Sequence, residues 1–214
     1  SQCYERTGKK PISVRWVIIN KGDDINYIIR ARLVGREFNN SPSLEMFAAT
    51  PPIEALKFLV SKAATSRGVN SQKGAYKLIF IDIRRAYMYA PETRDIYVDL
   101  PAQDSSPGMC GKLGKCMYGT RPAAQGWEKH YTNVLVDGLG FTQGKASVCV
   151  FYHEERDFRV VCHGDDFTGL GTREQCDWFH SELPKHFELK MSGRLGSAPD
   201  DDKSVRVLNR TVHW

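Results

Sequence analysis

The stretch RVVCHGDDFTGL, residues 159–170, holds the pattern on which the predicted fold depends. Strand-forming residues stop at His163-Gly164, two adjacent acids follow, and apolar residues then resume. This order predicts a β-hairpin that carries Asp165 and Asp166 at its tip. Neighbouring carboxylates in a mostly buried ribbon repel each other and lose hydration, so a bound divalent cation is one explanation for them. The other explanation is an acidic surface turn, because Gly-Asp is ordinary turn chemistry.

The composition is that of a soluble globular protein, with 214 residues of which 41% are hydrophobic and 26% charged. No apolar run approaches the roughly 18 residues needed to cross a bilayer, so we expect no membrane partner. The six cysteines are scattered and follow no secretion signal, which predicts reduced thiols in an intracellular protein. Cys176 and His180 lie one helical turn apart without a second pair of ligands, which argues against a zinc site. The net charge of +5 is compatible with a nucleic-acid partner.

Residues 12–34 predict a second β-hairpin, with a polar turn at residues 20–24. Arg30 and Arg32 share one face of its return strand because side chains alternate along a strand. Two like charges on one face are typical of a solvated edge. They also suit a phosphate clamp, since arginine binds phosphate with paired hydrogen bonds. Both interpretations stay open at this point.

The other segments alternate between strand and helix patterns. An apolar strand at residues 77–83 carries Asp82 at its end, where a lone acid is also a common N-cap for a following helix. A helix is expected over residues 51–67, begun by Thr50 and closed by Gly68. Further expected elements are a strand at 95–100, a basic hairpin at 109–118, a helix at 121–139, strands at 148–152 and 158–162, a helix at 172–183 with a Thr172–Gln175 capping box, and a strand at 186–191.

From residue 77 onward, this order of strands and helices predicts an α+β fold of the ferredoxin-like type, with helices on one face of an antiparallel sheet. In such a sheet the end of strand 77–83 lies beside the hairpin tip, which would bring Asp82 to Asp165 and Asp166. Three carboxylates at one point are stable only around cations. Together with arginines that hold phosphate, they are the groups that two-metal phosphoryl transfer requires.

Several blocks of the chain resemble, in order and at similar spacing, the reverse transcriptase of copia-type LTR retrotransposons. The blocks are TGKKPISVRWVIINKGD followed by IIRARLVGREF, then LIFIDIRRAYMYAPETRDIYVDLP, KLGKCMYGTRPAAQGWEKHYTNVLVDGLGF, VVCHGDDFTGLG and FELKMSGRLG. The resemblance covers nearly the full chain, and the ordered set is far more specific than any single block. It implies an RNA-directed DNA polymerase core that adds dNTPs to a primer 3′ end on an RNA or DNA template.

The resemblance also implies a site for two Mg²⁺ ions, which Mn²⁺ could replace. Asp82 and Asp165 would bridge the two ions, and Asp166 would complete the first metal site. The main-chain carbonyl of Ile83 would contribute to the second.

The same resemblance assigns residues to the incoming nucleotide. Tyr87 falls at the steric-gate position, where a bulky ring excludes a ribose 2′-OH. Arg30 and Arg32 lie in the hairpin that holds the triphosphate, and the register leaves open which of them makes the contact. Gly119 and Arg121 fall at the nucleotide and template pocket, where close backbone approach favours glycine.

By the same resemblance, the chain forms the fingers and palm of a right-hand polymerase. Residues 1–76 would be fingers, 77–94 the palm strand with the first catalytic acid, 95–120 a hairpin between fingers and palm, and 121–195 the rest of the palm. Residues 196–214 would be the truncated start of a thumb that is largely absent. The chain lacks an initiator Met, and we expect it to be part of a longer polyprotein with integrase and RNase H domains, acting in a cytoplasmic particle or the nucleus.

Three departures from the family pattern affect substrate contacts. Pro122 stands where the family usually has Gln, which removes a side-chain contact to the nucleotide. His163-Gly164, expected at the primer end, replaces Tyr-Val and so removes an aromatic ring. The chain also ends where a thumb would begin. Pro122 and the missing thumb favour a degenerate copy that binds nucleic acid without catalysis, whereas the intact acids favour a polymerase. A Mg²⁺-dependent nuclease would leave Tyr87 and the arginine pair unexplained.

Overall fold

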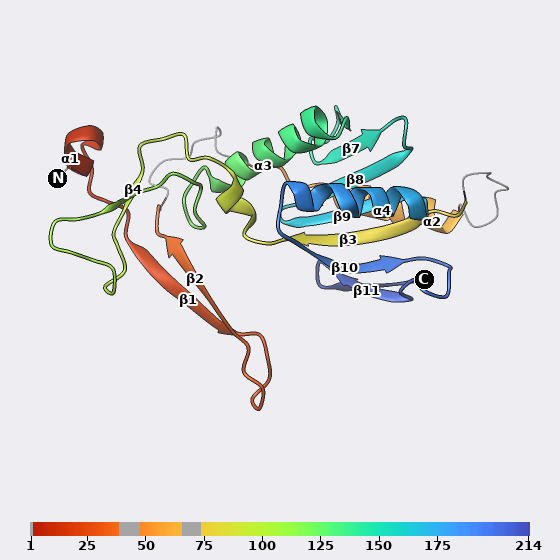
Figure 1. The fold of residues 1–214 in the computed structure, drawn as a ribbon, viewed down its shortest axis with the longest axis horizontal. Coiled ribbons are helices and arrows are strands. Elements are labelled where there is room, and N and C mark those ends of the chain that lie inside the picture. Colours follow the sequence, from red (N-terminus) through yellow and green to blue (C-terminus); the bar gives the residue numbers. More distant parts are fainter. Residues whose placement is uncertain (1, 39–47, 66–73) are drawn as a thin grey trace. The chain divides into compact units, whose positions relative to one another are not determined.

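The structure, a computed structural model, describes residues 2–38, 48–65 and 74–214 (Figure 1). The chain divides into two units: residues 1–47 with 87–127 form unit 1, and residues 48–86 with 128–214 form unit 2. Each unit therefore combines two separate stretches of sequence. The division into fingers and palm expected from the resemblance uses other boundaries than these two units, and it stays a prediction. Among the helices of the described residues, none combines the length and apolar content that crossing a membrane requires.

Unit 1 contains the β-hairpin predicted at residues 12–34, which the structure confirms. Strands β1 (Val14–Asn20) and β2 (Ile29–Gly35) pair antiparallel, with Val17 opposite Arg32 and Ile19 opposite Arg30. The two arginines therefore share one face of the ribbon, as their spacing predicts. A short helix, α1 (Gln2–Thr7), precedes the hairpin.

The rest of unit 1 differs from the sequence analysis in its short strands. The strand expected at 95–100 is reduced to β4 (Tyr97–Val98), which pairs antiparallel with β5 (Gly111–Lys112). The hairpin expected within residues 109–118 is therefore wrong, because the partner of β5 comes from an earlier segment. The predicted short helix after Asp82 is confirmed as a 3-10 turn, η3 (Ala86–Tyr89).

Unit 2 contains an antiparallel sheet with the strand order β10-β3-β9-β8-β7-β6. The strand β3 matches the predicted residues 77–83, and the hairpin of β8 and β9 confirms the pattern of residues 159–170. The connection β3–α3–β8–β9–α4–β10 is the predicted split βαβ arrangement. The strands are β3 (Lys77–Ile83), β6 (Thr142–Gln143), β7 (Val150–His153), β8 (Phe158–His163), β9 (Asp166–Gly171) and β10 (Leu189–Leu195).

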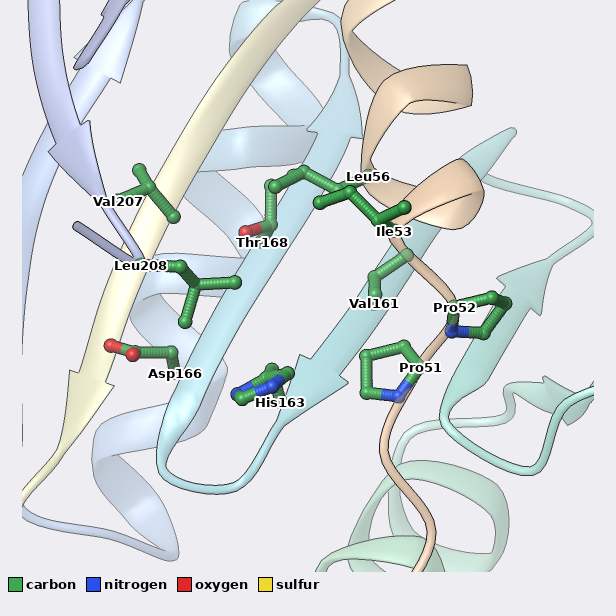
Figure 2. Close-up of a pocket in the computed structure, with 10 residues that line it drawn as sticks. All are labelled: Pro51, Pro52, Ile53, Leu56, Val161, His163, Asp166, Thr168, Val207 and Leu208. Carbon is green, nitrogen blue, oxygen red and sulfur yellow. The ribbon is translucent and has the colours of Figure 1, made fainter. Parts of the chain in front are cut away.

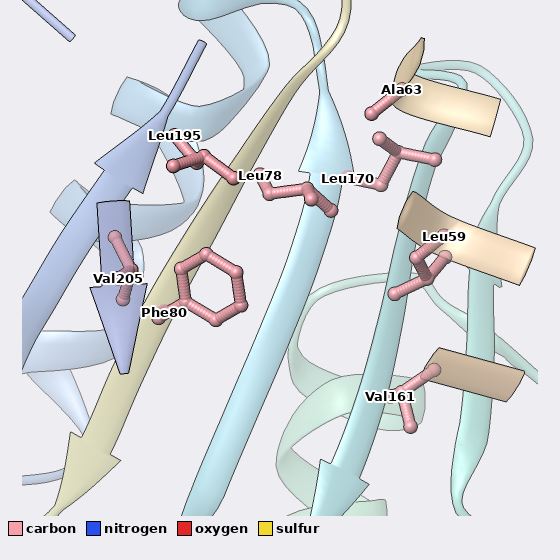
Figure 3. Close-up of a cluster of buried hydrophobic side chains, with 8 residues drawn as sticks. All are labelled: Leu59, Ala63, Leu78, Phe80, Val161, Leu170, Leu195 and Val205. Carbon is pink, nitrogen blue, oxygen red and sulfur yellow. The ribbon is translucent and has the colours of Figure 1, made fainter. Parts of the chain in front are cut away.

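Helices cover both faces of this sheet: α3 and α4 share one face, as predicted from residue 77 onward, and α2, which precedes that segment, covers the other. On one face, Leu59 and Ala63 of α2 (Ile53–Thr65) belong to the same buried cluster as Phe80 of β3 (Figure 3). Residues of opposite parity face α3 (Ala123–Asn133) and α4 (Arg173–Glu182). The ring of Phe167 lies 5.5 Å from that of Tyr131 in α3. Burial on both faces explains the nearly continuous apolar run of β3.

The helix ends differ in detail from the predicted ones. Helix α2 begins at Ile53 rather than Pro51, and its expected end at Arg67 and Gly68 lies outside the described residues. Thr172 occupies the N-cap position of α4, but its side chain makes no capping hydrogen bond, so the expected capping box is wrong. Helix α3 continues into a π-helical segment at Val134–Gly138, and α4 into a 3-10 turn at Leu183–Lys185. A final hairpin joins β11 (Ser204–Val207) to β12 (Arg210–His213).

Candidate active site

The acids predicted to act together lie at one end of the sheet in unit 2. Asp82 lies directly opposite Asp166 in the pairing of β3 with β9, and both are on the face that α2 covers. The main-chain N–H of Ile83 donates to the carbonyl oxygen of Asp165, with an N···O distance of 2.8 Å. This confirms that the end of β3 lies beside the predicted hairpin tip.

The hairpin tip is a two-residue turn formed by Gly164 and Asp165. His163 and Asp166 pair across its base, so Asp166 is the first residue of β9 and only Asp165 lies in the turn itself. Gly164 has a φ of +63°, whereas the φ of Asp165 is negative, which is the type II′ arrangement with glycine at the first position. The turn therefore places Asp165 at the end of the sheet, next to Ile83.

The surroundings of Asp166 disfavour its charged form. Burial and the negative charges of Asp165 and Asp82 together raise the pKa of Asp166 to about 6, while His163 opposes them. The carboxylates of Asp165 and Asp82 therefore act on that of Asp166. None of the three forms an ion pair with a Lys or Arg within the part of the chain that the structure describes.

Their donor chemistry fits a hard divalent cation, because carboxylate oxygens are the ligands that Mg²⁺ prefers. In the described residues, however, no three His, Cys, Asp or Glu side chains are already arranged to hold a metal ion. The backbone thus brings the acids to one end of the sheet. The site for Mg²⁺ stays a prediction.

A cavity of about 150 Å³ adjoins Asp166 on the α2 side of the sheet (Figure 2). His163 and Asp166 line it together with mostly apolar residues, which accounts for the burial of the Asp166 carboxylate. Leu208 reaches the cavity from the turn between β11 and β12, where Leu208 and Asn209 have φ values of +46° and +60°. The other lining residues are Pro51, Pro52, Ile53, Leu56, Val161, Thr168 and Val207.

The residues expected to hold the nucleotide lie in unit 1, where two of them, Tyr87 and Arg32, contact the same tyrosine. The centres of the Tyr118 and Tyr87 rings lie 4.6 Å apart, and the two ring planes meet at an angle of 38°. The guanidinium carbon of Arg32 lies 5.2 Å from the centre of the Tyr118 ring. Arg30, on the same face of β2, is exposed and makes no such contact in the described residues. Of the two predicted arginines, Arg32 is thus the one in contact with the tyrosine that packs against Tyr87.

Gly119 and Arg121 lie where the loop after β5 meets the end of β2. Gly119 has a φ of +83°, and a Cβ at this residue would lie 2.0 Å from the carbonyl oxygen of Gly35. The main-chain N–H groups of Gly35 and Glu37 donate to the carbonyl oxygens of Tyr118 and Gly119, at 2.8 and 3.2 Å. Only glycine permits this approach of the loop to β2, and the nucleotide contact expected at Gly119 stays a prediction.

Glu37 connects the same two segments through its side chain. Its carboxylate accepts two hydrogen bonds from Arg94, both of 3.1 Å, and one of 2.8 Å from the main-chain N–H of Arg121. Burial raises the pKa of Glu37, but these hydrogen bonds outweigh it and hold the pKa below its ordinary value. Arg121 also lines a polar cavity of about 620 Å³ that includes Lys9, Arg36 and Arg94.

A model of the family described as reverse transcriptase (RNA-dependent DNA polymerase) matches residues 4–197. The chain belongs to this family. The match covers most of both units and every residue that the sequence analysis assigned to the site. Copia-type elements are the usual context of these reverse transcriptases, in agreement with the resemblance of the sequence blocks. A comparison with curated proteins found no match.

Two residues of this reverse transcriptase domain were missed by sequence reasoning. Tyr118 precedes the assigned Gly119 in the block KLGKCMYGTRPAAQGW, but nothing in that block indicates a contact with Tyr87. Glu37 carried a usable signal, because it is the one acid in IIRARLVGREF among three arginines. An acid isolated in a basic segment commonly has a specific partner.

The structure also gives a local reason for Pro122 in this reverse transcriptase domain. Pro122 directly precedes the first residue of α3, and its carbonyl oxygen accepts a 2.7 Å hydrogen bond from the N–H of Gly126. Proline is favoured at the start of a helix because it needs no N–H partner there. The departure from the family pattern is thus compatible with the local fold.

Proposed function

We propose that this domain is the core of an RNA-directed DNA polymerase that adds dNTPs to a primer 3′ end in a two-metal phosphoryl transfer. The observation that carries the proposal is the position of Asp82 opposite Asp166, with Asp165 fixed next to Ile83. Membership of the reverse transcriptase family supports the same chemistry. The proposed partners are a template with its primer and the dNTPs. The proposed context is a longer retrotransposon polyprotein that carries integrase and RNase H domains.

In this proposal the three acids hold two Mg²⁺ ions, with the carbonyl of Ile83 as a further ligand. When bound, the ions would supply positive charge to the attacking primer hydroxyl and to the departing pyrophosphate. Mn²⁺ offers the same oxygen-ligand chemistry and is proposed as a substitute. His163 and Gly164 would lie against the primer end, because they immediately precede Asp165 in the turn.

The nucleotide would be held by the residues of unit 1. Arg32 keeps its N–H donors available, since in the described residues it forms neither an ion pair nor a side-chain hydrogen bond. A guanidinium with open donors suits the triphosphate. Tyr87 would exclude the ribose 2′-OH, and Gly119 with Arg121 would line the nucleotide and template pocket.

Primer extension tests the proposal most directly. The assay uses poly(rA) with an oligo(dT) primer, dTTP and Mg²⁺, and compares the wild type with Asp82→Ala and Asp165→Asn. We expect both variants to lose extension by at least a thousandfold while their binding to the primer–template, measured by fluorescence anisotropy, stays within about threefold. Full extension by Asp165→Asn would refute the two-metal assignment.

The alternative is a degenerate copy that binds nucleic acid without catalysis. Pro122, His163-Gly164 and the lack of a ready three-ligand metal site in the described residues favour it. The same assay separates the two functions: wild-type protein that binds the primer–template but does not extend it with Mg²⁺ or Mn²⁺ would establish the alternative.

A further inference from the structure

Tyr118 lies between two residues to which the proposed function gives separate tasks. The centre of its ring lies 4.6 Å from the centre of the Tyr87 ring and 5.2 Å from the guanidinium carbon of Arg32. The tilted aromatic pair and the cation–π contact each correspond to a factor of about two to ten in a local equilibrium. One ring therefore influences both the sugar side and the phosphate side of the expected nucleotide site.

The backbone around Tyr118 is fixed to the strand that carries Arg32. The carbonyl oxygen of Tyr118 accepts the N–H of Gly35, at 2.8 Å, and Gly35 is the last residue of β2. Gly119 accepts the N–H of Glu37, and a side chain there would collide with Gly35. Arg32 lies three residues before Gly35 on the same strand, so the Tyr118 ring and the guanidinium have a fixed common support.

Tyr87 lies on the short 3-10 turn η3 and is half-buried against Ala90, Cys116 and Ala123. Its ring also packs against the ring of Tyr118. A residue 31 positions away in the sequence therefore bears directly on the angle of the Tyr87 ring, and that contact suggests a role.

We propose that Tyr118 is a positioning residue for nucleotide selection, which orients the Tyr87 ring against the ribose 2′-OH and holds Arg32 ready for the triphosphate. This inference rests on the proposed polymerase function. It also favours Arg32 over Arg30 for the triphosphate, because Arg32 contacts Tyr118 and Arg30 makes no such contact in the described residues.

The test is steady-state incorporation of dTTP and UTP on poly(rA)/oligo(dT) by the wild type and four variants. Tyr118→Phe keeps the ring, Tyr118→Leu keeps apolar volume without a ring, Tyr87→Ala removes the gate, and Tyr87→Ala/Tyr118→Leu combines both. Tyr4→Ala, which removes a tyrosine 63% exposed on α1, serves as the matched control. Thermal midpoints of all variants verify that they fold.

For Tyr118→Leu we expect the ratio of kcat/KM for dTTP over UTP to fall about tenfold and KM for dTTP to rise about fivefold, with kcat changed less than threefold. Tyr118→Phe and Tyr4→Ala should stay within about twofold of the wild type. The double variant should discriminate no worse than Tyr87→Ala alone, because Tyr118 acts through Tyr87. Arg32→Ala should raise KM for dTTP more than Arg30→Ala.

Two results would overturn the inference. One is unchanged sugar discrimination and KM in folded Tyr118→Leu; the other is a double variant whose loss equals the product of the single losses. Failure of the proposed function has a different signature, since the wild type would then show no Asp82-dependent extension at all. A merely structural role for Tyr118 predicts a lower thermal midpoint with an unchanged dTTP/UTP ratio.

Discussion

Replacing Asp201 with Asn removes the charge that compensates a buried lysine at the start of β3. The side chain of Asp201 is fully buried, and that of its partner Lys77 is only 7% exposed. One carboxylate oxygen accepts hydrogen bonds from Lys77 and from the N–H of Ala198, while the other accepts a 3.0 Å bond from Arg194. An asparagine has a single acceptor oxygen, so its NH₂ group must face one of these donors.

The expected cost follows from the burial of the pair. Removing one partner of a buried ion pair destabilises a protein by about 3–5 kcal/mol, because the remaining charge is left uncompensated. Typical domains unfold with about 5–15 kcal/mol, so the loss is a large part of the total. With a urea dependence of about 2 kcal/mol per molar, the urea midpoint of Asp201→Asn should fall by about 1.5–2.5 M.

Asp200→Asn is the matched control because the same change is made one residue away. Asp200 accepts hydrogen bonds from Arg173, at 2.6 Å, and Arg194, at 3.2 Å, but its side chain is 57% exposed. Exposed ion pairs contribute little, so its urea midpoint should stay close to that of the wild type. In the Asp201→Asn background, Lys77→Met should recover part of the loss, because it removes the uncompensated charge.

The pH dependence gives a second readout of the same pair. Burial raises the pKa of Asp201, but hydrogen bonds from Lys77 and Ala198 outweigh it and place the pKa below its ordinary value of 3.8. The pair therefore stabilises the fold fully above about pH 4, and this contribution is lost as the pH falls toward the lower folded-state pKa. The wild-type urea midpoint should fall more steeply below pH 4 than that of Asp201→Asn. Equal midpoints for the Asp200 and Asp201 variants at pH 7 would refute the reasoning.

Two further predictions concern packing. Gly119→Ala places a Cβ 2.0 Å from the carbonyl oxygen of Gly35, whereas Gly164→Ala meets nothing within 4 Å and adds only left-handed strain of about 1 kcal/mol. In urea denaturation, Gly119→Ala should therefore lower the free energy of unfolding more than twice as much as Gly164→Ala. Equal losses would contradict the contact at Gly35. Leu59→Ala should destabilise by about 2–5 kcal/mol because Leu59 is 1% exposed against the sheet. Its neighbour Phe58, 57% exposed, provides the control, and a larger loss in Phe58→Ala would mean that α2 packs through its other side.

Much of the central fold follows from sequence pattern because its signals are local. The run KLIFIDI predicts β3 at its observed residues, and the turn residues between two apolar runs predict the β8–β9 hairpin, although Asp166 lies in β9 and not at the tip as expected. The position of Asp82 beside that tip then follows from the order of strands and helices. These inferences need only side-chain periodicity, turn chemistry and the connectivity of a split βαβ unit.

The features that sequence reasoning missed depend on contacts between distant segments. The amphipathic stripe of α2 shows that one side is buried, but not which face of the sheet buries it. The two-residue strands β4 and β5 are too short to carry a period, and their pairing joins Tyr97 to Lys112. The contact of Tyr118 with Tyr87 likewise joins segments whose local patterns are independent of each other.

Asp201 and Asp166 lie in opposite electrostatic environments, and the difference bears on function. Asp201 has Lys77 and Arg194 as partners, and its pKa is lowered. Asp166 has two other acids as neighbours, and its pKa is raised to about 6 by burial and by those charges. In the described residues, no Lys or Arg pairs with Asp82, Asp165 or Asp166. The divalent ion proposed above would supply positive charge to these acids, because hard cations prefer carboxylate oxygens as ligands.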